Sequence, residues 1–258
     1  MTRFRRRSAV WLLATLLLLL PLQLPAQAPK PVQARIAVAS NFADVARALA
    51  RDYGKRTGQR IEISAASTGK LYAQVRAGAP FDALLAADAA TPRRLVEEGL
   101  ARGDTVFDYA VGRLVLWSRD PGLVRDGEAL LRKGSIPRLA IANPALAPYG
   151  AAARDVLQHV RRWQELRPRL VMGENIGQAM QFVASGAAPL GLVPRSLVLQ
   201  ARLRAPGSGW EVPAHWHAPI VQSAVVLAHG DRNVAAIGFL RYLRSPEGRA
   251  RIRAHGYD

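Results

Sequence analysis

Hydrophobic and polar positions along this chain follow two periods, one typical of strands and one typical of helices. After an alternating run at 34–39, apolar residues recur every three or four positions through Phe42, Leu49 and Tyr53, and this helix stops at Thr57-Gly58. The expected strands are 34–39, 61–65, 81–86 and 113–117, and the expected helices are 42–57, 69–77 and 92–99. This βαβαβαβ succession predicts an α/β fold with a parallel sheet and helices on both faces.

A loop rich in Asp, Pro and Gly at 119–127 opens a second α/β unit. Its expected strands are 139–142, 170–172 and 190–193, its expected helices are 151–160 and 178–184, and a strand at 223–228 and a helix at 234–243 end the chain. We expect the last strand to return to the first sheet. This crossing predicts two lobes, 34–112 with 222–258 and 113–221, with a ligand cleft between them and hinges near Gly112 and Gln222.

The first 28 residues have the pattern of a secretory signal. Basic residues at 3–7 precede an apolar run at 9–20, and Ala26-Gln27-Ala28 is a small-x-small cleavage site. We therefore expect export through the Sec pathway to the periplasm. The 258-residue chain has no cysteine, which excludes disulfides, zinc–thiolate sites and cysteine nucleophiles.

The formal charge of +17, four less without the arginines at 3–7, raises the question of a nucleic-acid partner. The arginines are scattered over helix faces with Ala and Leu, as at Arg47, Arg51 and Arg154, and are not interleaved with aromatic residues. Together with export, this argues against nucleic-acid binding.

Small polar residues and glycine recur where expected helices begin after strands. These helix starts contain Ser40-Asn41, Ser67-Thr68-Gly69, Tyr149-Gly150 and Ile176-Gly177. Unpaired backbone N–H groups and the helix dipole make such starts suitable for anions, and ligands of open α/β sheets lie beyond the carboxyl ends of strands. Hydroxyls of Ser40 and Thr68 and the amide of Asn41 add side-chain donors. Together these groups predict a site for a small dianion.

Three other kinds of site fit the sequence less well. Ser67-Thr68-Gly69-Lys70 is similar to part of a P-loop, but Ser64 replaces its first glycine and Leu71 its magnesium-binding hydroxyl. His215 and His217 would share a strand face and could bind a metal, but no third ligand is evident. A hydrolase would need a nucleophile–base pair or a carboxylate pair, and no histidine lies near the helix starts.

The segment at 66–82, ASTGKLYAQVRAGAPFD, resembles the periplasmic molybdate-binding proteins (ModA) of ABC importers. The resemblance begins at Ala39-Ser40-Asn41-Phe42 and continues in the same order through 143–150, 174–176 and 189–193. It implies a two-lobed type II periplasmic binding protein fold that holds molybdate or tungstate and delivers it to a membrane permease. It also implies a monomer without a cofactor that is not an enzyme.

Carried over by position, the resemblance implies that Ser40, Asn41, Thr68, Tyr149 and Ile176 bind the oxyanion and its metal, with Ser67 as a neighbour of the site. Some members place a tyrosine directly after the strand at 190–193, where this chain has Pro194. Tyr149 is expected to replace it, through either its phenol or its backbone N–H. The alternatives are a binding protein for sulfate or phosphate, or an anion-dependent enzyme on the same fold.

Overall fold

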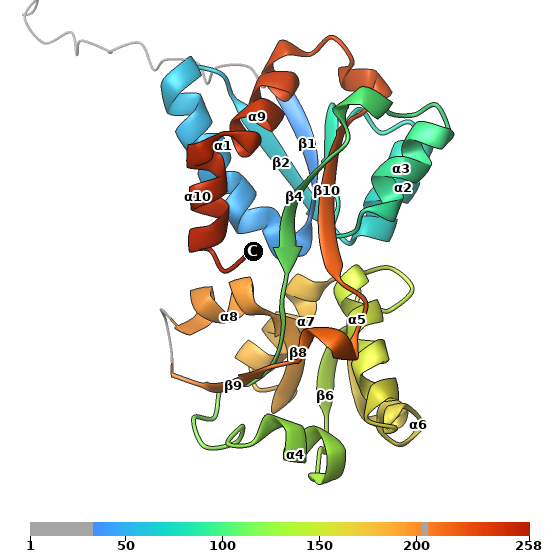
Figure 1. The fold of residues 1–258 in the computed structure, drawn as a ribbon, viewed down its shortest axis with the longest axis vertical. Helices are drawn as coiled ribbons and strands as arrows, with labels where there is room; N and C mark the ends of the chain where they lie inside the picture. The colour runs from blue at the N-terminus through green and yellow to red at the C-terminus, as the bar shows by residue number, and fades with distance from the viewer. Residues whose placement is uncertain (1–32, 203–205) are drawn as a thin grey trace, which may run out of the picture. The chain divides into compact units, whose positions relative to one another are not determined.

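The computed structural model describes residues 33–202 and 206–258, which belong to one compact unit (Figure 1). The expected signal segment at 1–28 lies outside the described residues. Among the described helices, none combines the length and the apolar character that crossing a bilayer requires. The strands form two five-stranded sheets.

The first sheet has the strand order β2-β1-β3-β10-β4. Its strands are β1 (Ala34–Ala39), β2 (Ile61–Ala66), β3 (Ala83–Leu85), β4 (Phe107–Gly112) and β10 (Ile220–Val226). β1 is parallel to β2 and β3, but β10 is antiparallel to both of its neighbours, β3 and β4. The prediction of a parallel sheet was therefore wrong for this half, because the returning strand enters from the opposite direction.

The second sheet has the order β7-β6-β8-β5-β9. Its strands are β5 (Leu114–Ser118), β6 (Leu139–Ala142), β7 (Leu170–Gly173), β8 (Leu190–Pro194) and β9 (Ser208–Glu211). β6 is parallel to β7 and β8, whereas β5 is antiparallel to β8 and β9. The strand expected at 113–117 is thus a member of the second sheet.

Helices cover both faces of each sheet. Successive residues of a strand point to opposite faces, so they pack against different helices. In β1, Ile36 and Val38 pack with α1 (Ala43–Thr57), α9 (Val234–Arg244) and α10 (Pro246–Ala254), and Ala37 packs with α2 (Thr68–Arg76) and α3 (Ala90–Glu97). The second sheet is covered by α4 (Gly127–Lys133), α5 (Pro148–His159), α6 (Trp163–Leu166), α7 (Ile176–Ala184) and α8 (Arg195–Arg202).

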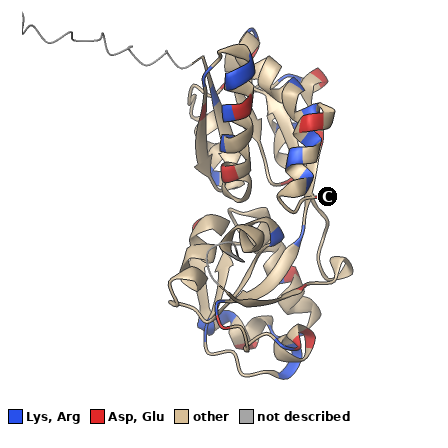
Figure 2. Ribbon diagram, turned by 90° about the vertical axis from the view of Figure 1, so that its left-hand side faces the viewer, with Lys and Arg blue, Asp and Glu red and all other residues tan. Residues whose placement is uncertain are grey.

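Charged residues of both signs are distributed along the helices that cover the two sheets (Figure 2). Many are ion pairs between neighbours on one helix, such as Arg47 with Asp44 and Arg132 with Glu128. Exposed pairs of this kind contribute little stability each. The excess of arginine is therefore spread over the surface among carboxylates, as its scattered positions in the sequence indicate.

Phe42 lies at the centre of the packing beside the carboxyl end of β1. It is fully buried in the 3-10 helix η1 (Ser40–Phe42), and its ring centroid is 4.7 Å from that of Tyr109 and 5.3 Å from that of Tyr257. These rings join η1 to β4 and to the end of the chain.

We expect Phe42→Ala to destabilise the protein by about 3–5 kcal/mol, because it leaves a cavity among aromatic rings. Urea unfolding followed by circular dichroism measures the loss. Val234→Ala is the control, since Val234 is 73 % exposed and its truncation should change stability by less than about 0.5 kcal/mol. Equal effects of the two substitutions would contradict this account of the packing.

Candidate functional site

Each predicted helix start follows the carboxyl end of a strand. η1 follows β1, α2 follows β2, and α5 and α7 come after β6 and β7. Since β1 is parallel to β2 and β6 is parallel to β7, the two starts of each pair lie at one edge of their sheet. These are the edges at which open α/β sheets bind ligands.

Three contacts bring the two pairs of helix starts together. The backbone N–H of Gly69 donates to the carbonyl of Leu146 at 2.9 Å, and Lys70 Nζ lies 2.6 Å from Glu174 Oε1. A Cβ on Gly177 would lie 3.9 Å from Ser40 Cβ, so η1 and the start of α7 are close neighbours. The edges of the two sheets therefore face each other.

Four residues at these helix starts are buried and carry free backbone donors. Asn41, Thr68, Tyr149 and Ile176 are 1 %, 2 %, 1 % and 2 % exposed. Within the described residues, none of their backbone N–H groups donates a hydrogen bond to another backbone group. The first N–H groups of a helix have no acceptor in the helix itself, but buried N–H groups are nearly always paired. The arrangement is suited to a ligand that supplies acceptors.

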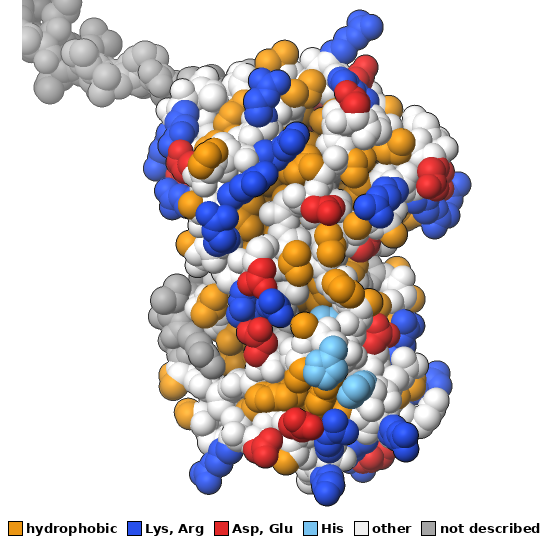
Figure 3. All heavy atoms as spheres, in the orientation of Figure 1, with side chains coloured by type: hydrophobic (Ala, Val, Ile, Leu, Met, Phe, Trp, Pro, Cys, Tyr) orange, Lys and Arg blue, Asp and Glu red, His pale blue; other side chains and the backbone are white. Residues whose placement is uncertain are grey.

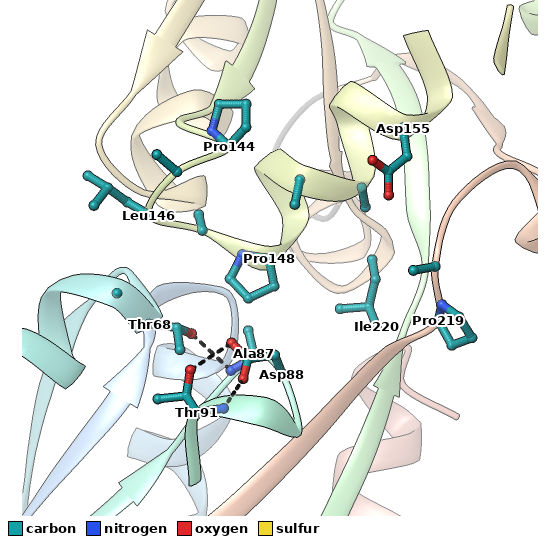
Figure 4. Close-up of a pocket in the computed structure, with 16 residues that line it drawn as sticks. Thr68, Ala87, Asp88, Thr91, Pro144, Leu146, Pro148, Asp155, Pro219 and Ile220 are labelled. Atoms are coloured by element: carbon teal, nitrogen blue, oxygen red, sulfur yellow. Dashed lines mark hydrogen bonds between the residues drawn. The ribbon is translucent and has the colours of Figure 1, made fainter. Parts of the chain in front are cut away.

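The hydroxyls at the start of α2 are also placed as donors. Thr68 Oγ1 accepts the backbone N–H of Ala87 at 3.0 Å, as Figure 4 shows, and donates no hydrogen bond among the described residues. Ser67 is 2 % exposed, and its Oγ has no hydrogen-bond partner in the described part of the chain. The predicted neighbour Ser67 therefore has an unused donor as well.

The side-chain amide of Asn41 has a different role from the one expected. Its Nδ2 donates to Gln222 Oε1 at 2.9 Å and to the hydroxyl of Tyr257 at 3.1 Å. Both amide protons are thus used inside the protein. The free donor of Asn41 is its backbone N–H.

The phenol of Tyr149 lies between the two sheets. Gln222 Nε2 donates to the Tyr149 hydroxyl at 3.4 Å, and a Cβ on Gly112 would lie 2.0 Å from the same oxygen. Burial raises the pKa of Tyr149 well above its usual value, and burial also raises the pKa of Tyr257 to about 12. Both phenols are therefore neutral at physiological pH and can donate a proton in a hydrogen bond.

Beside these helix starts is a cavity of about 370 Å³, in which Thr68 and Asp88 lie opposite Pro148 (Figure 4). The carboxylate of Asp88 accepts the backbone N–H of Thr91 at 2.6 Å and its hydroxyl at 3.1 Å. Asp82 accepts the backbone N–H of Arg35 at 2.7 Å. Both carboxylates therefore accept backbone N–H groups, Asp88 within its own turn and Asp82 from the neighbouring strand β1.

The histidines do not form a metal site in the part of the chain that the structure describes. Residues 214–216 form the 3-10 helix η4, so the strand expected around His215 and His217 was wrong. His159 stacks on Trp216 with ring centroids 4.7 Å apart, and histidine side chains lie together on the face shown in Figure 3. His159 therefore packs against an aromatic ring.

Two residues around the candidate site were not predicted from the sequence to contact it. Gly112 and Gln222 were expected only as hinges, yet both contact the Tyr149 phenol. A glycine at the end of a strand only weakly indicates that another side chain approaches the backbone there. Nothing in the sequence predicts the hydrogen bond between Gln222 and Asn41.

Residues 34–258 match the family model described as bacterial extracellular solute-binding protein. The chain belongs to this family. The molybdate-binding protein ModA of Azotobacter vinelandii is 42 % identical to this solute-binding protein over 245 residues, 95 % of this chain and 97 % of its own. The resemblance stated from the sequence is thereby confirmed.

Solved structures agree with this assignment. The periplasmic molybdate-binding protein of Azotobacter vinelandii superimposes with a TM-score of 0.83 at 38 % identity, over 87 % of this chain and 98 % of its own. The sulfate-binding protein SubI of Mycobacterium tuberculosis has a TM-score of 0.70 at 15 % identity, over 88 % of this chain and 86 % of its own. The second likeness shows the fold alone, and the periplasmic binding protein fold is confirmed.

Gly112→Ala should displace the Tyr149 phenol, because the new Cβ would overlap its oxygen. We expect a stability loss of about 1–3 kcal/mol and a changed near-ultraviolet circular dichroism spectrum. Gly122→Ala is the control: its Cβ would lie 3.4 Å from Asp120 Oδ1, an ordinary contact, and should destabilise by no more than about 0.5 kcal/mol. If Gly112→Ala behaved like this control, the Tyr149 hydroxyl would lie elsewhere.

Proposed function

We propose that this solute-binding protein captures molybdate or tungstate between its two lobes and delivers the oxyanion to the permease of an ABC importer. It acts as a periplasmic monomer after removal of residues 1–28, and it is a binder without a cofactor rather than an enzyme. The lobes are 34–112 with 222–258 and 113–221. The oxyanion is held by Ser40, Asn41, Thr68, Tyr149 and Ile176, with Ser67 beside them.

The observation that carries this proposal is the set of four buried helix starts whose backbone N–H groups lack backbone acceptors among the described residues. A tetrahedral oxyanion has only acceptor atoms, and its charge suits the positive ends of helix dipoles. Buried donors left without acceptors cost about 1–3 kcal/mol each, so the ligand would relieve this cost. The neutral phenol of Tyr149 and the hydroxyl of Thr68 would add charge-assisted hydrogen bonds.

The relatives support the choice of molybdate over other anions. The protein from Azotobacter vinelandii is named for molybdate binding and is similar over nearly the whole chain. Molybdate and tungstate have nearly equal size and charge, so both should fit. Sulfate carries the same charge but is smaller, and we expect it to leave several donors out of reach.

The site joins the two lobes, because Asn41 and Thr68 come from the first and Tyr149 and Ile176 from the second. A bound oxyanion should therefore favour closure about the strands that connect the lobes. The Lys70–Glu174 ion pair spans the same gap, but both side chains are half exposed and the pair contributes little. We expect the closed conformation to be the one that binds the permease.

Isothermal titration calorimetry with molybdate, tungstate, sulfate and phosphate tests the ligand. We expect tight binding of the first two, and sulfate and phosphate should bind at least about a hundredfold more weakly, a difference of about 2.7 kcal/mol. Small-angle scattering should show a smaller radius of gyration with molybdate. Comparable binding of sulfate would contradict the molybdate assignment and favour the general oxyanion alternative.

Thr68→Val tests the hydroxyl at the start of α2. Loss of a hydrogen bond to a charged group should weaken molybdate binding about tenfold to a hundredfold, measured by calorimetry. Thr68→Ser is the matched control, because it keeps the hydroxyl that accepts from Ala87, and it should bind within about threefold of the parent if the hydroxyl is what matters. Parent-like binding by Thr68→Val would place the site elsewhere.

Ser67→Ala tests whether the Ser67 hydroxyl binds the oxyanion or only lies beside the site. Its Oγ is buried without a partner among the described residues, so its removal should stabilise the free protein or leave it unchanged. If Ser67 is only a neighbour, molybdate affinity should fall less than in Thr68→Val. A larger loss would make Ser67 the principal hydroxyl.

A further inference from the structure

The side-chain amide of Gln222 is the meeting point of polar groups from both sheets. Gln222 is fully buried in β10, and its Oε1 accepts from Asn41 Nδ2 at 2.9 Å and from the Tyr109 hydroxyl at 3.0 Å. Its Nε2 donates to the Tyr149 hydroxyl at 3.4 Å. Asn41 lies in η1, directly after β1, and Tyr109 lies in β4 of the first sheet, whereas Tyr149 is in the first turn of α5, which covers the second sheet.

The direction of these hydrogen bonds is set by their chemistry. Asn41 presents an NH₂ group, so the group of Gln222 that faces it must be the oxygen. Nε2 must then face Tyr149 and act as the donor. Because the Tyr149 oxygen accepts this bond, its single proton remains available, and it donates no hydrogen bond among the described residues. The chain of donors thus runs from Asn41 through Gln222 to a phenol with an unused proton.

Asn41 is held in the same way from its other side. The Tyr257 hydroxyl donates to the Asn41 carbonyl at 2.8 Å and accepts from Asn41 Nδ2 at 3.1 Å and from Ser196 Oγ at 3.0 Å. With its carbonyl and its amide both engaged, Asn41 has one orientation, and the backbone N–H is the donor left free. Hydrogen bonds in such buried networks polarise one another, so each fixes the next.

We propose that Gln222 is a positioning residue of the oxyanion site: it orients the Tyr149 phenol proton and the Asn41 backbone toward the ligand and thereby couples the donors of the two lobes. This inference rests on the proposed function. Gln222 contacts Asn41 and Tyr149, which supply donors to the ligand, and acts through them. Its effect on affinity should therefore depend on the presence of the Tyr149 hydroxyl.

A double-mutant cycle with Gln222→Met and Tyr149→Phe tests this dependence by calorimetry with molybdate. Each single substitution should weaken binding about tenfold to a hundredfold, because a hydrogen bond to the charged ligand is lost or misdirected. The double variant should lose much less than the product of the two single losses, since both remove the same donor. A residue needed only for stability would instead give losses that multiply.

Gln222→Glu keeps the shape of the side chain and provides a second variant. Its carboxylate would accept the Tyr149 proton and add negative charge near the dianion, so it should bind molybdate more weakly than Gln222→Met. Gln158→Glu is the control, because Gln158 is exposed at the far end of α5, and its affinity should stay within about twofold of the parent. Thermal unfolding without ligand shows that each variant is folded.

The outcomes separate the two claims. If the parent protein binds molybdate and Gln222→Glu or Gln222→Met binds it equally well, the positioning role of Gln222 is overturned. The proposed function is then unaffected. Losses that multiply in the cycle, or Tyr149→Phe binding like the parent, overturn the positioning role too. A parent protein that binds none of the tested oxyanions overturns the proposed function itself.

Discussion

Buried hydrogen-bond donors need acceptors, and in this protein the donors at the helix starts face one another across two sheets. Asn41, Thr68, Tyr149 and Ile176 contribute backbone N–H groups without backbone acceptors among the described residues, and the hydroxyls of Thr68 and Tyr149 lie with them. A parallel arrangement of β1 with β2 and of β6 with β7 is what brings these starts to matching edges. The chemistry proposed for the site follows from this placement, because buried neutral donors favour a ligand made of acceptors.

The same constraint explains why polar side chains around the candidate site are joined by hydrogen bonds. Gln222, Tyr109 and Tyr257 are buried, and each is engaged by partners that fix its orientation. Burial raises the pKa values of Tyr109 and Tyr257, so the network stays neutral and keeps its direction. Gly112 completes it by leaving room for the Tyr149 oxygen. Donors supported in this way need little rearrangement when a ligand arrives.

Local patterns in the sequence predicted the elements that carry the site. The 3.6-residue period through Phe42, Leu49 and Tyr53 located α1, and the small polar residues before α2 marked its start. β4, β9, α4, α6, α8 and α10 were missed: α10, for example, buries only Gly248 and Ile252 and has little apolar periodicity. The antiparallel course of β10 and the Asn41–Gln222 hydrogen bond could not be predicted, because both depend on contacts between residues far apart in the chain.

The position of β10 also bears on the order in which the protein folds. β4 pairs with β10 alone in the first sheet, so it has no neighbouring strand until residues beyond 220 are present. The second sheet, by contrast, is built entirely from 114–211. In a chain that emerges N-terminus first from a ribosome or a translocation channel, we therefore expect the second sheet to form before the first is complete. During that interval the apolar face of β4 is without its partner, which makes the first half of this chain the part that most needs protection from aggregation.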